Sequence, residues 1–149
     1  MKKQIITHSP QATKALAQQI ARHLKDKAVI TLSGDLGAGK TTFTQGLAKG
    51  LDIKKMVSSP TFTIMKIYMG RLKLVHIDAY RLEGLHQDLG FEELIGTEGV
   101  CVIEWPDYIK DLLPKSYLEI KMTRLDEDDR LIELISHGSK YLHILENLE

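Results

Sequence analysis

The residues from Gly34 to Thr41 read GDLGAGKT and match the pattern G-x-x-x-x-G-K-[ST] at every fixed position. The glycines permit backbone angles closed to other residues, so successive amide hydrogens can turn inward around phosphate oxygens. Lys40 would place its ammonium on the β- and γ-phosphates, and the Thr41 hydroxyl would complete one vertex of a magnesium shell. A tight structural turn is the alternative, but a turn alone does not need the lysine and the hydroxyl together. The motif predicts a phosphate-binding loop (P-loop), with nucleotide contacts from Gly34, Asp35, Leu36, Gly37, Ala38, Gly39, Lys40, Thr41 and Thr42.

Two apolar runs further along the chain each end in an acidic residue. The run from Leu74 to Asp78 has the Walker B form, in which a strand brings a carboxylate beside the P-loop to hold a metal-bound water. His76 interrupts that run, and Asp78 could instead cap the following turn. The run from Val100 to Glu104 is the second, and a strand terminus at the same sheet edge would aim Glu104 into the nucleotide crevice. The alternative for a buried glutamate is an ion pair with a lysine or arginine.

Hydrolysis needs more than a P-loop, because an acidic residue must reach the magnesium and some group must position water. We expect Lys40, Asp78 and Glu104 to be the catalytic residues, and Thr41, Asp78 and Glu104 to hold Mg²⁺. The sequence leaves open whether Asp78 or Glu104 ligates the metal directly.

The hydroxyl-rich stretch SSPTF at 58–62 follows the expected P-loop helix. Switch loops of P-loop proteins contact the γ-phosphate and its magnesium at this place, so Thr61 or Ser59 could report the nucleotide state. The alternative is a loop that enters a strand and is stiffened by Pro60.

Two motifs that the sequence lacks argue against GTP as the nucleotide and against a small-molecule kinase. GTPases of this kind usually read guanine with an N-K-x-D segment, whereas the one asparagine here is Asn147, near the C-terminal end. Small-molecule kinases need a lid with paired arginines, and the five arginines at 22, 71, 81, 124 and 130 are scattered. Of these reactions, the sequence favours ATP binding with hydrolysis that drives a conformational cycle. An independent kinase of a small metabolite, and a nucleotide-gated binding module without useful hydrolysis, are the competing hypotheses.

Composition adds limits on partners and compartment. The 149 residues carry 20 Lys plus Arg and 20 Asp plus Glu, and this balance argues against a broad electrostatic surface for nucleic acid or an anionic membrane. The lone cysteine, Cys101, lies in an apolar run and fits a reducing compartment. No segment approaches the roughly 20 apolar residues of a membrane span, so we expect a cytoplasmic protein. The six histidines show no zinc spacing.

The order of the expected elements predicts an α/β fold, a single P-loop NTPase domain over residues 1–149 with a mixed central sheet flanked by helices. Ser9 and Pro10 should cap and begin the first helix. The acidic turn 126–129 is most simply the solvated tip of a hairpin, with a metal site as the alternative. The expected strands cover 2–7, 28–32, 61–68, 72–77, 100–105, 117–123 and 130–136, and the expected helices 10–24, 41–51, 107–113 and 139–148, with antiparallel pairing across the turn at 69–71.

Several motifs together resemble one family, the bacterial TsaE (YjeE) ATPases, which are required for making threonylcarbamoyl-adenosine on transfer RNA. The segments occur in the family's order and spacing, and they are GDLGAGKTTF, SSPTF, HIDAYRL from His76 to Leu82, LGFEE from Leu89 to Glu93 and IEWP from Ile103 to Pro106. The resemblance implies ATP and Mg²⁺ binding, weak intrinsic ATPase activity, and association with TsaB and TsaD, with tRNA reached only through that complex. Hydrolysis would reset the complex between catalytic rounds.

The resemblance also implies roles for individual residues. Lys40 and Thr41 would serve phosphate and magnesium, Asp78 the Walker B role, and Glu104 the metal or the attacking water. Ser59, Pro60 and Thr61 would form a switch-like loop, with Trp105 beside the site and nucleotide contacts from the backbone near Pro10 and the side chain of Arg130.

Two aromatic or basic residues near these motifs could equally be structural. Trp105 is the only tryptophan and could be a core anchor, since its large apolar area favours burial. Arg81 resembles an arginine finger, and pairing with Glu83 or Glu92 is the alternative, so we leave it outside the catalytic set. The partner-binding surface and nucleotide-dependent self-association are left open by the sequence.

Overall fold

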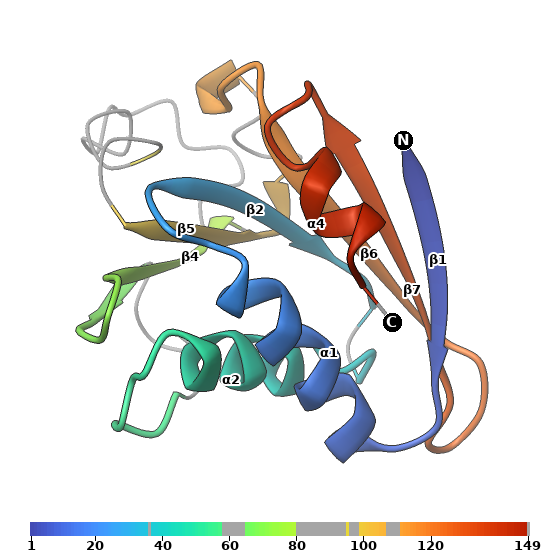
Figure 1. Ribbon diagram of the computed structural model, residues 1–149. Helices are drawn as coiled ribbons and strands as arrows, with labels where there is room; N and C mark the ends of the chain where they lie inside the picture. The colour runs from blue at the N-terminus through green and yellow to red at the C-terminus, as the bar shows by residue number, and fades with distance from the viewer. Residues whose placement is uncertain (36, 58–64, 80–94, 96–98, 107–110, 149) are drawn as a thin grey trace.

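The computed structural model describes residues 1–149 apart from 36, 58–64, 80–94, 96–98, 107–110 and 149 (Figure 1). The described residues form a seven-stranded sheet in the order β1-β7-β6-β2-β5-β4-β3. A mixed sheet flanked by helices confirms the predicted fold class. The strands are β1 (Lys2–Thr7), β2 (Ala28–Ser33), β3 (Met65–Tyr68), β4 (Leu74–Asp78), β5 (Val100–Glu104), β6 (Tyr117–Arg124) and β7 (Arg130–His137), and the helices are α1 (Pro10–Arg22), α2 (Lys40–Gly50) and α4 (Leu142–Glu146).

The centre of the sheet is parallel and its margins are antiparallel. β2 pairs in parallel with both β5 and β6, and β5 pairs in parallel with β4. β3 runs antiparallel to β4, and β7 antiparallel to β6 and β1, so both predicted hairpins are confirmed. The carboxyl ends of the four central strands therefore meet at one edge, where open α/β sheets bind their ligands.

Helices α1 and α2 lie side by side against one face of the sheet (Figure 1). The Ser9 side chain caps α1 by accepting a hydrogen bond from the backbone N–H of Ala12 at 3.0 Å, as predicted. The buried stripe of α1 includes Leu16 and Ile20, which join the core between these helices and the sheet. None of the helices in the described ranges is long and apolar enough to cross a membrane.

The closing helix is shorter than the predicted span 139–148, because α4 covers only Leu142–Glu146. The backbone around it makes bonds of the tighter i to i−3 type, such as Leu142 N–H to Ser139 O and Asn147 N–H to Ile144 O. Tyr141, just before α4, is buried, and its hydroxyl accepts a bond from the backbone N–H of Val29 at 2.9 Å. Because this bond anchors Tyr141 to β2, the helix begins only after Tyr141.

A second, smaller core lies on the other face of the sheet and contains Cys101 with Val29, Val75 and Ile103. The Cys101 side chain is fully buried, and burial raises the pKa of its thiol to about 12.

We predict that Cys101 resists alkylation in the folded protein, since the thiolate is the reactive form and is disfavoured here. Iodoacetamide at mildly alkaline pH, followed by mass spectrometry, should find Cys101 unmodified in native protein and modified in urea. Complete labelling of the native protein would contradict the buried position.

Candidate nucleotide site

The P-loop connects β2 to α2, and its backbone has a positive φ at three described glycines, Gly34, Gly37 and Gly39, with Gly37 at 83°. Gly39 immediately precedes α2 and has a left-handed φ of 99°. Gly34 begins the loop with a φ of 155°, and a Cβ atom there would lie 2.5 Å from the carbonyl oxygen of Met122. Side chains at either position would strain the loop or push β6 away. Leu36, predicted to contact nucleotide, lies outside the described residues.

Lys40 is the first residue of α2, and its side chain turns back across the P-loop. Its ammonium donates a hydrogen bond to the backbone carbonyl of Gly34, and Nζ lies 4.1 Å from the centroid of the Trp105 ring. Burial lowers the pKa of Lys40, while the nearby carboxylates of Glu104, Asp78 and Asp35 oppose that shift. The ammonium is thus held between the loop and the acidic strand ends.

Asp78 and Glu104 are the last residues of adjacent parallel strands and are paired in register. The sequence predicted that both carboxylates lie at one edge of the sheet, and the strand pairing confirms this position. Glu104 is buried, and its Oε2 atom lies 2.6 Å from Nε2 of His76. Among the described residues, its hydrogen-bonded partner is His76 on β4, and Lys40 interacts with it electrostatically.

The donors at this edge suit magnesium. Thr41 supplies a hydroxyl at the start of α2, and Asp78 and Glu104 supply carboxylates, which are hard oxygen ligands. Within the described part of the chain, no three His, Cys, Asp or Glu side chains are grouped as metal ligands. Nucleotide-bound Mg²⁺ takes only one or two carboxylates and completes its shell with phosphate and water, so the donor set fits this ion.

Trp105 follows β5 directly and has a positive φ of 58°, which is uncommon for a residue with a bulky side chain. Its side chain is only partly buried, and its ring faces the Lys40 ammonium. This position favours a place beside the site over the alternative of a core anchor.

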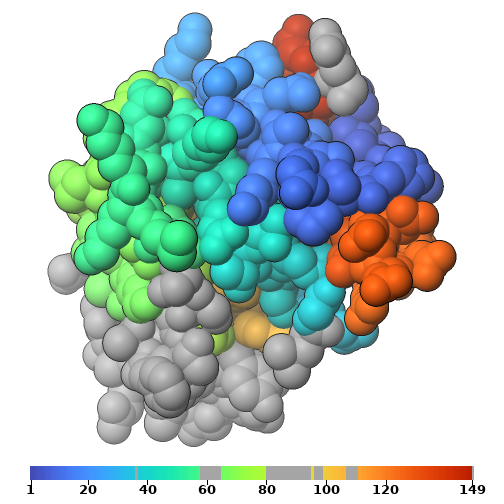
Figure 2. Space-filling view, turned by 90° about the horizontal axis from the view of Figure 1, so that it is seen from below, coloured from blue at the N-terminus to red at the C-terminus, as the bar shows by residue number. Residues whose placement is uncertain are grey.

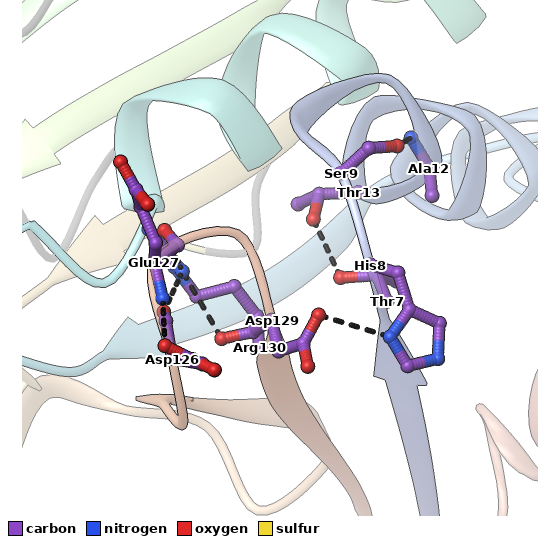
Figure 3. Close-up of polar contacts among 9 residues, drawn as sticks. All are labelled: Thr7, His8, Ser9, Ala12, Thr13, Asp126, Glu127, Asp129 and Arg130. Carbon is purple, nitrogen blue, oxygen red and sulfur yellow. Dashed lines mark hydrogen bonds and ion pairs between the residues drawn. The ribbon is translucent and has the colours of Figure 1, made fainter.

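Arg130, the first residue of β7, joins the P-loop to the turn between β6 and β7. Its Nε and Nη2 atoms donate to the carbonyls of Ala38 and Gly37 at 3.1 and 3.2 Å. Its Nη1 atom donates to three turn carbonyls, each at 3.0 Å, those of Asp126, Glu127 and Asp129 (Figure 3). The guanidinium therefore fixes the outer part of the P-loop by its backbone.

The start of α1 completes this corner of the site. His8 Nδ1 lies 2.9 Å from Asp129 Oδ1, and the hydroxyls of Thr7 and Thr13 are 2.7 Å apart (Figure 3). Figure 2 shows the beginning of the chain, α2 and the β6–β7 turn gathered on one face. A small cleft of about 30 Å³ lies between them and is lined by Pro10, Thr13, Gly39, Thr42, Asp128 and Arg130.

We predict that Arg130→Ala weakens ATP binding about tenfold, because hydrogen bonds from a charged donor contribute roughly 1.5–3 kcal/mol and hold the loop in shape. Arg130→Lys should not restore affinity, since one ammonium cannot span the loop and the turn. Isothermal calorimetry would measure both variants. Arg124→Ala is the matched control, because Arg124 is exposed and, among the described residues, its side chain donates one long bond of 3.4 Å to Asp126 O. Wild-type affinity in Arg130→Ala would contradict this role.

The structure brings together most of the residues that the sequence singled out. The P-loop, Lys40, Asp78, Glu104 and Trp105 meet at one sheet edge, and Pro10, Thr42 and Arg130 line the adjoining cleft. The acidic turn 126–129 is the tip of the β6–β7 hairpin, as expected, and its carbonyls hold Arg130. Ser59, Thr61, Arg81 and the segment 89–93 lie outside the described residues.

Sequence reasoning missed the role of His76, which it treated only as an interruption of an apolar strand. A histidine two residues before a Walker B aspartate was the available signal, because alternate residues of a strand share a face.

Comparisons with known proteins agree with this geometry. The family model described as threonylcarbamoyl adenosine biosynthesis protein TsaE matches residues 7–132. A Bacillus subtilis (strain 168) protein named tRNA threonylcarbamoyladenosine biosynthesis protein TsaE is 46% identical over 143 residues, covering 95% of this chain and 90% of the relative. The protein of that name from Treponema pallidum (strain Nichols) is 40% identical and covers 85% and 96%.

A solved structure gives the same result. The crystal structure of Bacillus subtilis YdiB superposes with a TM-score of 0.84 at 39% identity, covering 98% of this chain and 93% of that one. The family match spans most of the chain, and both named relatives are well above 30% identical over nearly their full lengths. The chain therefore belongs to the TsaE family.

Proposed function

We propose that this chain binds ATP with Mg²⁺ and hydrolyses it slowly, as a subunit of the assembly that makes the threonylcarbamoyladenosine modification of tRNA. The observation that carries the ATPase proposal is the meeting of Lys40, Asp78 and Glu104 at the carboxyl edge of the parallel strands. The names of the relatives support the tRNA modification, and they do not support the alternative of an independent kinase for a small metabolite.

Each residue of the site has a task in this proposal. The P-loop amides and the Lys40 ammonium bind the β- and γ-phosphates, and Lys40 exchanges its Gly34 contact for phosphate oxygens. Glu104 orients the attacking water, and the side chains that hold the metal are Thr41, Asp78 and Glu104. Mg²⁺, when bound, neutralises charge on the β- and γ-phosphate oxygens.

The proposed turnover is slow because part of the site comes from elsewhere. Arg130 is the arginine that contacts the P-loop among the described residues, and its guanidinium is committed to backbone carbonyls rather than to a γ-phosphate. We infer that TsaB and TsaD are the partners, that tRNA is reached only through them, and that hydrolysis resets the complex between rounds. The net charge of zero fits indirect contact with RNA, and we place the assembly in the cytoplasm.

The test is phosphate release from ATP and Mg²⁺ by the purified chain, alone, with TsaB and TsaD, and with a panel of small acceptors. We expect slow release by the chain alone and faster release with the two partners. Binding can be followed separately through the fluorescence of Trp105, the only tryptophan, whose ring contacts the Lys40 ammonium. Transfer of the phosphoryl group to a small acceptor would favour the kinase, and binding without phosphate release under any condition would favour a nucleotide-gated module.

A further inference from the structure

The contact between His76 and Glu104 is a deeply buried polar pair beside the nucleotide site. His76 Nε2 and Glu104 Oε2 are 2.6 Å apart, and the two side chains are 0% and 7% exposed. Placing a carboxylate in such surroundings is costly unless a hydrogen bond compensates it. The imidazole supplies that bond, and the proposed function does not otherwise use it.

The strand register explains how the pair forms. His76 is opposite Val102, and Asp78 is opposite Glu104, on the parallel strands β4 and β5. Alternate residues point to one face, so His76, Asp78 and Glu104 share the side on which Leu74 and Val102 pack into the α1 and α2 core. His76 lies two residues before the carboxyl end of β4. Its side chain therefore approaches Glu104 diagonally across the two strands, from the side away from the strand ends.

The other ring nitrogen settles the direction of the bond. Nδ1 of His76 is buried and has no hydrogen-bond partner among the described residues. A proton on Nδ1 would be a buried donor without an acceptor, which costs more than a bare lone pair. We therefore assign a proton to Nε2, so that the imidazole donates to the Glu104 carboxylate.

Holding the two strands together does not require this bond. β4 and β5 are already paired over five residues, from Leu74 opposite Val100 to Asp78 opposite Glu104. The pair acts instead on the orientation of one carboxylate, because it fixes Oε2 and restrains rotation of the group. Supporting hydrogen bonds of this kind typically change activity by about 10- to 100-fold when they are removed from a site.

We propose that His76 is a positioning residue for ATP hydrolysis, which anchors Oε2 of Glu104 so that its other oxygen is directed toward the attacking water. The inference rests on the proposed ATPase function. It predicts that changes at His76 affect the rate of turnover far more than the affinity for ATP, because His76 bonds to Glu104 and not to the P-loop or Lys40 in the described contacts.

The test compares His76→Leu with His76→Gln, whose amide nitrogen occupies the place of the imidazole Nε2. We expect kcat to fall at least about tenfold in His76→Leu with the Kd for ATP within about twofold of wild type, and His76→Gln to recover most of the rate. His137→Leu is the matched control, since His137 Nε2 makes a similar 2.7 Å contact with Glu119 Oε1, on the other face of the sheet from Glu104. That variant should keep the wild-type kcat.

The outcomes separate this inference from the proposed function. Wild-type protein that releases no phosphate, with or without partners, would defeat the proposed function. Wild-type protein that turns over while His76→Leu matches its kcat would overturn the positioning role alone. If His76→Leu does not fold by circular dichroism, His76→Asn replaces it, because its shorter amide cannot reach Glu104, and equal kcat in the Asn and Gln variants would then overturn the inference.

Discussion

Lys40→Ala is expected to reduce ATP affinity by about 100-fold or more, because the variant removes the one ammonium that would bind the β- and γ-phosphates. The Lys40 residue is only 9% exposed, and burial lowers its pKa, so the folded protein holds this charge at a cost in solvation. Replacing it with a methyl group relieves that cost while losing the contacts to Gly34 and Trp105. We therefore expect Tm to stay within about 5 °C of wild type.

Calorimetric titration with ATP and Mg²⁺, together with thermal unfolding, would measure both effects. Lys49→Ala is the control on the same helix, because Lys49 is exposed near the end of α2 and far from the loop. Unchanged affinity in a folded Lys40→Ala protein would contradict the proposed phosphate site. Failure of the wild-type protein to bind any nucleoside triphosphate would remove the whole proposal.

Glu104→Ala should retain ATP binding and lose turnover by about 100-fold or more, the range expected when a group that positions or activates water is removed. The alanine variant also leaves His76 buried without its partner, so Glu104→Gln is needed beside it. Glutamine keeps the shape and can still accept a bond from Nε2 of His76, but it carries no charge for water or metal. Both variants should therefore have a strongly reduced rate of ATP hydrolysis.

Single-turnover phosphate release, with Trp105 fluorescence as the separate binding signal, would distinguish lost chemistry from lost affinity. Glu119→Gln provides a control, since Glu119 also contacts a histidine but lies on β6, on the face of the sheet opposite to that of Glu104. Hydrolysis at the wild-type rate in Glu104→Gln would show that this carboxylate does not act on the water. Asp78, the other carboxylate at a strand end, would then be tested for that role.

The sequence predicted where the candidate residues lie when they belong to short motifs or strand ends. Gly34 to Thr41 identified the loop by spacing alone, and apolar runs that end in Asp78 and Glu104 indicated two carboxylates at one edge. Their pairing in register depends on β4 and β5 being adjacent, which the structure shows and the order of elements did not predict. These predictions succeeded because backbone periodicity places such residues with little help from distant contacts.

Other features depend on contacts that the sequence does not encode locally. The bond between His76 and Glu104 joins residues 28 apart, and those from Arg130 to Ala38 and Gly37 join residues 92 and 93 apart. The resemblance to a family gave Arg130 a nucleotide role but not its support of loop carbonyls. The length of α4 was missed for the same reason, because the burial of Tyr141 against β2 shortens it.

The pairing of β1 with β7 has a consequence for synthesis of the protein. Residues 2–7 leave the ribosome before the other strands of the described sheet, yet they pair with residues 130–135, in its last strand along the sequence. Arg130, which holds the carbonyls of Gly37 and Ala38, begins that same late strand. A nascent chain thus carries the phosphate motif well before the strand that brings Arg130 to the loop, and the loop gains this support only after β7 has been synthesised.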